Sequence, residues 1–215
     1  MLSAVTRAHV KDPLREYGLV RGPHILCGMT RVLVVPGYQN SGPGHWQTLW
    51  EQQNPDYIRV EQDDWEHPTC DAWVGRIDEA INASEEEVVL VAHSLGAIAV
   101  VRWAAAHVGP VRAALLVAPA DVENLPDYPF ESFAPVPLAP LPFEAFVVGS
   151  ITDPYVSIER ARAFAGAWRA VFIDAGDAGH INVDSGHGPW DQGELLLAGL
   201  LPGTPGSDDP TVVIA

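Results

Sequence analysis

Short runs of apolar residues alternate with amphipathic segments along most of the chain. Six runs rich in Val, Ile, Leu and Phe have the composition and length of buried strands: 31–35, 57–60, 87–92, 112–118, 143–149 and 171–174. Five segments carry apolar residues at helical spacing: 46–52, 70–81, 97–105, 158–168 and 191–201. Thr69 and Ser157 precede two of these segments and are expected to cap them. This alternation predicts a parallel sheet covered by helices on both faces.

The two ends of the chain differ in composition from the region between them. Residues 1–28 hold the only lysine, Lys11, and carry four basic against two acidic residues, a net charge of +2 that leaves −18 for the remainder of the −16 total. We expect residues 1–28 to be an extension outside the fold and residues 29–201 to form a single domain. Residues 202–215, rich in Pro, Gly, Ser and Asp near their start, are expected to be a disordered tail.

The overall charge excludes several classes of partner. The chain has 28 Asp and Glu against 12 Lys and Arg, and such an acidic surface repels both nucleic-acid phosphates and anionic membranes. No apolar run approaches the length of about 18 residues that a membrane span needs. We therefore expect no nucleic-acid partner and no membrane partner, and a monomer by default.

Cysteine usage and short motifs limit the cofactors. The two cysteines, Cys27 and Cys70, form neither a disulfide framework nor a C-x-x-C pair, so a reducing cytoplasm is the expected location. No G-x-G-x-x-G motif or P-loop occurs. The acidic residues and histidines of the segment 174–187 lack zinc or EF-hand spacing. We expect neither a cofactor nor a metal ion.

The segment Ala92-His93-Ser94-Leu95-Gly96 lies between a predicted buried strand and a predicted helix. A serine flanked by small residues two positions before and after it is typical of a nucleophile elbow, in which the chain turns sharply from strand to helix. The hydroxyl then lies at a helix N-terminus, where developing negative charge is favoured. The alternative is an ordinary serine that caps the helix at a strand–helix turn.

A serine nucleophile needs a histidine base and an acid that orients it, and in folds with a nucleophile elbow the chain order is serine, acid, histidine. Only His180 and His187 follow late enough among the eight histidines, and His180 is favoured because it lies just past the last predicted strand. Asp153, directly after the fifth strand, is the favoured acid. Asp121, after the fourth strand, is its competitor, and either aspartate could instead be a solvated loop carboxylate.

The oxyanion of the reaction needs two hydrogen-bond donors. One is expected from the backbone N–H of Leu95, the residue after the nucleophile. The other is expected from the loop after the first strand, where Tyr38 follows Gly37 and Gln39 comes directly behind. Gln39, and His93 beside the nucleophile, are also candidates for substrate contacts.

The segment 120–141 connects the fourth and fifth predicted strands. It contains five prolines, so we expect a short, stiff cap or wall rather than a hinged lid. Phe130 and Phe133 are candidate apolar contacts for the substrate.

Several groups of residues between about 31 and 200 occur together in the order found in one known family: Pro36-Gly37-Tyr38 with Ser41 and His45-Trp46, Gln62-Asp63-Asp64-Trp65 with Pro68, His93-Ser94-Leu95-Gly96, Ser150-x-x-Asp153-Pro154-Tyr155, Gly179-His180-Ile181-Asn182, and Gly186-x-Gly188-x-Trp190. In these groups the chain resembles the small serine hydrolases related to retinoblastoma-binding protein 9, often called YdeN-like, of the α/β-hydrolase superfamily. The resemblance does not cover residues 1–28 or the tail. Ala92 replaces the usual glycine, a mild departure because alanine is also small.

This resemblance implies a reduced α/β-hydrolase fold with about six mostly parallel strands in the order 2-1-3-4-5-6. It also implies a triad of Ser94, Asp153 and His180, in agreement with the chain order. The expected activity is hydrolysis of a small ester through an acyl-enzyme on Ser94. Amide or peptide hydrolysis by the same triad, and a protein-interaction module on a hydrolase scaffold, are the alternatives.

Overall fold

The computed structural model describes residues 30–84 and 86–203, and the predicted extension 1–28 lies outside them. These residues form one six-stranded sheet in which all neighbouring strands are parallel. The strand order is β2-β1-β3-β4-β5-β6, as predicted. The strands are β1 (Arg31–Val35), β2 (Tyr57–Arg59), β3 (Val88–His93), β4 (Val111–Val117), β5 (Glu144–Gly149) and β6 (Val171–Asp174).

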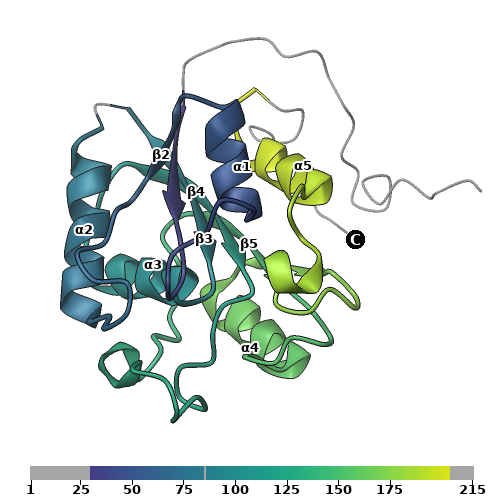
Figure 1. Cartoon of the computed structure of the whole chain (residues 1–215). Helices are drawn as coiled ribbons and strands as arrows, with labels where there is room; N and C mark the ends of the chain where they lie inside the picture. The colour runs from purple at the N-terminus through teal and green to yellow at the C-terminus, as the bar shows by residue number, and fades with distance from the viewer. Residues whose placement is uncertain (1–29, 85, 204–215) are drawn as a thin grey trace, which may run out of the picture.

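Five α-helices cover the two faces of the sheet. They are α1 (Trp46–Gln53), α2 (Cys70–Asn82), α3 (Leu95–Ala106), α4 (Ile158–Trp168) and α5 (Asp191–Leu200). Helices α1 and α5 lie side by side on one face (Figure 1), where they pack on Val89 and Val91 of β3. Helices α2, α3 and α4 lie on the opposite face, in the core that contains Leu90 and Ala92. The strand side chains alternate between two cores, which is why the strands read as continuous apolar runs.

The helix starts agree only in part with the capping predicted from the sequence. The Ser157 hydroxyl accepts a hydrogen bond from the backbone N–H of Arg160, as an N-cap should. Thr69 stands at the N-cap position of α2 but makes no capping bond with its side chain. The Ser132 hydroxyl, 62 residues away, accepts the bond from the Cys70 N–H instead. The segment 120–141 is therefore fastened to the start of α2.

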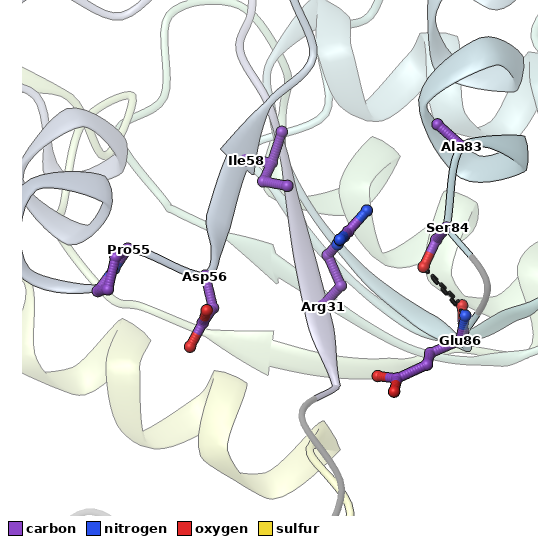
Figure 2. A pocket seen from close by; sticks show the side chains of 7 residues that line it. All are labelled: Arg31, Pro55, Asp56, Ile58, Ala83, Ser84 and Glu86. Carbon is purple, nitrogen blue, oxygen red and sulfur yellow. Dashed lines mark hydrogen bonds between the residues drawn. The ribbon is translucent and has the colours of Figure 1, made fainter.

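A shallow hollow of about 450 Å³ lies at the edge of the sheet where the strands begin. Figure 2 shows its lining, which comes from the starts of β1 and β2 and from the turn before β3: Arg31, Pro55, Asp56, Ile58, Ala83, Ser84 and Glu86. The elbow and the other candidate catalytic residues follow the carboxyl ends of strands, at the opposite edge. This hollow is therefore remote from the candidate chemistry.

None of the helices between residues 30 and 203 is long and apolar enough to cross a bilayer.

Candidate active site

Ser94 occupies a sharp turn between the central strand β3 and helix α3. Its backbone has φ 54° and ψ −122°, a conformation that non-glycine residues rarely adopt. A Cβ on Gly96 would lie 2.4 Å from the carbonyl oxygen of Pro36, and one on Gly37 would lie 2.8 Å from Cβ of Ser94. The chain leaving β1 thus crosses closely over the turn, so glycine is required at both crossing points. This geometry is that of the predicted nucleophile elbow.

His180 lies in the loop after β6 and faces Asp153 from the loop after β5. Its Nδ1 is 2.9 and 3.0 Å from the two carboxylate oxygens. The Asp153 side chain is fully buried and that of His180 is 8% exposed. Because an ionised carboxylate only accepts hydrogen bonds, Nδ1 carries the hydrogen and Nε2 is left to accept a proton. The pair has the arrangement of a general base held by its orienting acid.

The two alternative residues make other contacts. Asp121 pairs with the guanidinium of Arg160 at 3.3 Å and accepts a hydrogen bond from the amide of Asn124. His187 lies beside the Ser185 hydroxyl at 3.4 Å. The structure thus brings the favoured histidine and acid together and places their competitors in other surroundings.

The backbone of the His180 loop is held at four consecutive residues by side chains from distant parts of the chain. The contacts are Ala178 N–H to Ser150 Oγ (3.0 Å), Gly179 N–H to Thr152 Oγ1 (3.0 Å), His93 Nε2 to His180 O (2.9 Å) and Trp46 Nε1 to Ile181 O (2.9 Å). The backbone φ is positive at Gly179 and at Ile181. These contacts supply the stabilisation that keeps an unfavourable loop conformation in place.

Three histidine rings lie in a row behind the elbow. The ring centroids of His45 and His93 are 4.9 Å apart, and those of His93 and His180 are 4.7 Å apart. Burial lowers the pKa of His93 well below its usual value, and the nearby His180 and His45 add to this effect. Burial, together with the charge of Arg59, lowers the pKa of His45 to about 3. His45 and His93 are therefore uncharged at neutral pH.

Two backbone N–H groups beside the elbow are available to an incoming oxyanion. The N–H of Leu95 is the first of α3 and has no intrahelical acceptor. The N–H of Tyr38 has no hydrogen-bond partner within residues 30–84 and 86–203, whereas the N–H of Gln39 donates to the carbonyl of Trp65. The structure therefore favours Tyr38 over Gln39 as the second donor.

The loop that carries Tyr38 is fixed by Gln47 and Arg59, which sequence reasoning missed. The buried Gln47 amide donates to the carbonyls of Val35 and Val91 and accepts from the Ser41 hydroxyl. Arg59 donates to the side chain of Asn40 and to the backbone of Ser41, and its charge is balanced by Glu51 at 2.7 Å. Arg59 is the only charged residue of the predicted strand 57–60. That was the one signal in the sequence that could have indicated such a role.

Three of the four predicted substrate contacts are buried. Phe133 is fully buried and Phe130 is 4% exposed, so both belong to the core beneath the cap instead of forming a substrate-facing surface. His93 is buried between two other histidine rings, which also removes it from the surface. Gln39 is exposed, and its side chain donates to Glu66.

Two half-buried tyrosines, Tyr155 and Tyr128, form an aromatic pair next to the His180 ring. Tyr155 packs edge-on against the His180 ring at 4.5 Å, and Tyr128 packs edge-on against Tyr155 at 5.8 Å. A hydrogen bond with Tyr128 raises the pKa of Tyr155, so its phenol is uncharged at neutral pH. Tyr155 belongs to the Ser-x-x-Asp-Pro-Tyr motif, which was the signal for it. Among the described residues, no group of three or more His, Cys, Asp or Glu side chains is arranged to hold a metal ion.

Comparison with known proteins gives one family and many similar structures. The family model described as serine hydrolase matches residues 32–199. A YdeN-like hydrolase from Pectobacterium atrosepticum is 33% identical, with a TM-score of 0.74 over 80% of this chain and 93% of that one. The ydeN gene product of B. subtilis is 18% identical, with a TM-score of 0.67 over 80% of this chain and 98% of that one.

A more distant structure shares the fold alone. The enzyme Est1E from Butyrivibrio proteoclasticus, solved with ferulic acid bound, is 14% identical, with a TM-score of 0.60 over 80% of this chain and 86% of that one. No curated protein sequence matches the chain.

Proposed function

Because the chain belongs to the serine hydrolase family, we propose that it cleaves a small ester through an acyl-enzyme on Ser94. The observation that carries this proposal is the pairing of His180 with Asp153 in the loops beside the elbow. The Ser94 hydroxyl is partly exposed and has no hydrogen-bond partner among the described residues, so it is free to attack a bound carbonyl.

In the proposed first step, Oγ of Ser94 attacks the ester carbonyl carbon while Nε2 of His180 takes its proton. Asp153 keeps the proton on Nδ1 and stabilises the imidazolium that forms. The N–H groups of Leu95 and Tyr38 donate to the oxyanion of the tetrahedral intermediate. When the intermediate collapses, the C–O bond to the leaving alcohol breaks and His180 returns the proton to that alcohol.

The second step repeats the chemistry with water in place of the serine. His180 removes a proton from a water molecule, which attacks the acyl carbon, and the bond to Oγ of Ser94 then breaks. The carboxylic acid leaves, and the serine recovers its proton from His180. The same residues could cleave an amide if the leaving amine received the proton, and amides therefore belong in the substrate panel.

The test is hydrolysis of p-nitrophenyl esters and aminoacyl amides together with labelling by a fluorophosphonate probe. Ser94→Ala should lower ester hydrolysis by at least about 10³-fold and abolish labelling, because the nucleophile is gone. Ser84→Ala, which removes an exposed hydroxyl at the opposite edge of the sheet, is the matched control and should retain both signals. Wild-type activity in Ser94→Ala would contradict the proposal, and a wild-type protein that escapes the probe would favour an interaction module.

A further inference from the structure

The ring of His93 contacts the residue proposed as the catalytic base. In a deduction that rests on the proposed function, we propose that His93 is a positioning residue: its ring N–H holds the backbone carbonyl of His180 and so directs the His180 imidazole toward Ser94. His93 was expected from the sequence to contact substrate, so this role replaces the earlier one.

The contact itself fixes which ring atom of His93 carries the hydrogen. Nε2 lies 2.9 Å from the carbonyl oxygen of His180, and both residues are buried. A carbonyl oxygen only accepts hydrogen bonds, so Nε2 must be the protonated nitrogen of the neutral ring. The bond joins residues 87 positions apart, and it connects the end of β3 to the loop after β6.

The His180 ring is held at Nδ1 by Asp153, and the His180 backbone carbonyl is held by His93. The first contact limits rotation of the ring, and the second fixes the position of the His180 backbone from which the ring extends. Without the donor, the buried carbonyl would lack its partner and the loop would shift to find one. A displacement of about 1 Å in a reacting group costs on the order of 10²-fold in rate, so a small shift of this loop should appear mainly in kcat.

A neutral ring suits this position because His180 becomes positively charged during the proposed reaction. A second charge on His93, with ring centroids 4.7 Å apart, would oppose that step. The ring of His45 lies on the other side of His93 and is also uncharged at neutral pH. His93 thus provides a donor without adding a charge next to the base.

The first experiment compares His93→Leu with His93→Gln. Glutamine can place an amide N–H near the position of Nε2, whereas leucine fills space without a donor. The leucine variant should lower kcat for a p-nitrophenyl ester by about 10–100-fold with little change in KM, and the glutamine variant should stay within about threefold of wild type. His107→Gln, at the far end of α3, is the control and should match wild type.

The same variants have a spectroscopic signature that packing alone would not change. The His180 N–H bonded to the Asp153 carboxylate should give a far-downfield proton resonance in the wild type and in His93→Gln. The resonance should broaden or disappear in His93→Leu if the ring loses its orientation. This measurement needs no substrate, so it tests the positioning role even if the proposed hydrolysis fails.

Four results would overturn the proposal. Wild-type kcat in a folded His93→Leu protein would show that the contact is dispensable. A raised KM at unchanged kcat would make His93 a substrate contact, and equal losses in the two variants would reduce its role to packing. If His93→Leu does not fold, nitrogen NMR of the wild-type ring decides, because a hydrogen on Nδ1 instead of Nε2 would exclude the bond. Absence of labelling and hydrolysis in the wild type would count against the proposed function alone.

Discussion

The loops that follow β4 and β5 each present an aspartate at the same edge of the sheet, but the two side chains have opposite surroundings. Asp121 and Asp153 both lie four positions beyond the last residue of the preceding strand, Val117 and Gly149 respectively. Asp121 is paired with the cation of Arg160. Asp153 has no arginine partner among the described residues and meets only His180 and the backbone N–H of Tyr155.

The difference shows that position along a strand does not assign an acid to a histidine. A carboxylate already neutralised by a guanidinium has less negative potential to offer a developing imidazolium. Arg160 also contacts Glu123, so the loop after β4 is joined to α4 by a charge network. The loop after β4 thus attaches the cap to the domain, and the loop after β5 carries the candidate chemistry.

The largest expected effect on activity is that of Asp153→Asn, and it distinguishes Asp153 from Asp121 as the acid that orients His180. Asp153→Asn should lower kcat by about 10²–10⁴-fold, because the neutral amide can hold His180 in the wrong tautomer and cannot stabilise the imidazolium. Steady-state kinetics on the purified variant measure this loss, and circular dichroism checks that the protein is folded. A loss smaller than that of Asp121→Asn would reverse the assignment of the acid.

An intermediate effect is expected from the hydroxyl that joins the loop after β5 to the His180 loop. Ser150 is buried and bonds to Gly176 O and Ala178 N–H. Ser150→Ala leaves the Ala178 N–H unpaired, whereas Gly176 O keeps the hydrogen bond that it accepts from the Ile151 N–H. The loss should cost about 1–3 kcal/mol of folding free energy and lower kcat by about tenfold. Urea denaturation and ester kinetics measure the two effects.

Thr152→Val is the matched control for Ser150→Ala. Thr152 is exposed, so water can replace its hydroxyl at the Gly179 N–H. Its effects should be smaller on both measurements. Equal effects of the two variants would show that burial does not decide the importance of these contacts.

The smallest effect on activity is expected in the loop after β4. Asp121→Asn should change kcat by less than about tenfold, because the carboxylate contacts no candidate catalytic group. It should instead lower the melting temperature, by about 2–4 °C for each kcal/mol lost from the contact with Arg160. Thermal unfolding followed by circular dichroism tests this. An unchanged melting temperature together with a large loss of kcat would place Asp121 in the site.

Much of the architecture could be predicted from the sequence because it depends on local patterns. The strands read as apolar runs since both faces of the sheet are covered, and their predicted bounds agree with the structure to within two residues. The elbow could be recognised because Ala92, Ser94 and Gly96 fall within five consecutive residues, although the crossing at Gly37 comes from a distant part of the chain. Asp153 and His180 could be proposed from chain order and from a motif, and the structure then showed their contact.

Contacts between distant segments could not be predicted in the same way. Trp46 reads as an ordinary apolar helix residue, yet its indole N–H reaches the carbonyl of Ile181, 135 positions away. Nothing in the sequence indicates that the neighbouring Gln47 joins the carbonyls of Val35 in β1 and Val91 in β3. Phe133 was misassigned for a related reason, since an aromatic residue in a proline-rich segment can equally face a substrate or, as here against Trp73, the core.

The wide spacing of the site along the chain has a consequence for how the protein gains activity as it folds. The elbow serine is formed by the first half of the sequence, but the His180 loop begins only after β6, the last strand of the sheet. A folding intermediate that lacks a docked β6 would contain the serine turn without its base. Recovery of hydrolysis during refolding would therefore report completion of the whole sheet, later than any signal from the helices.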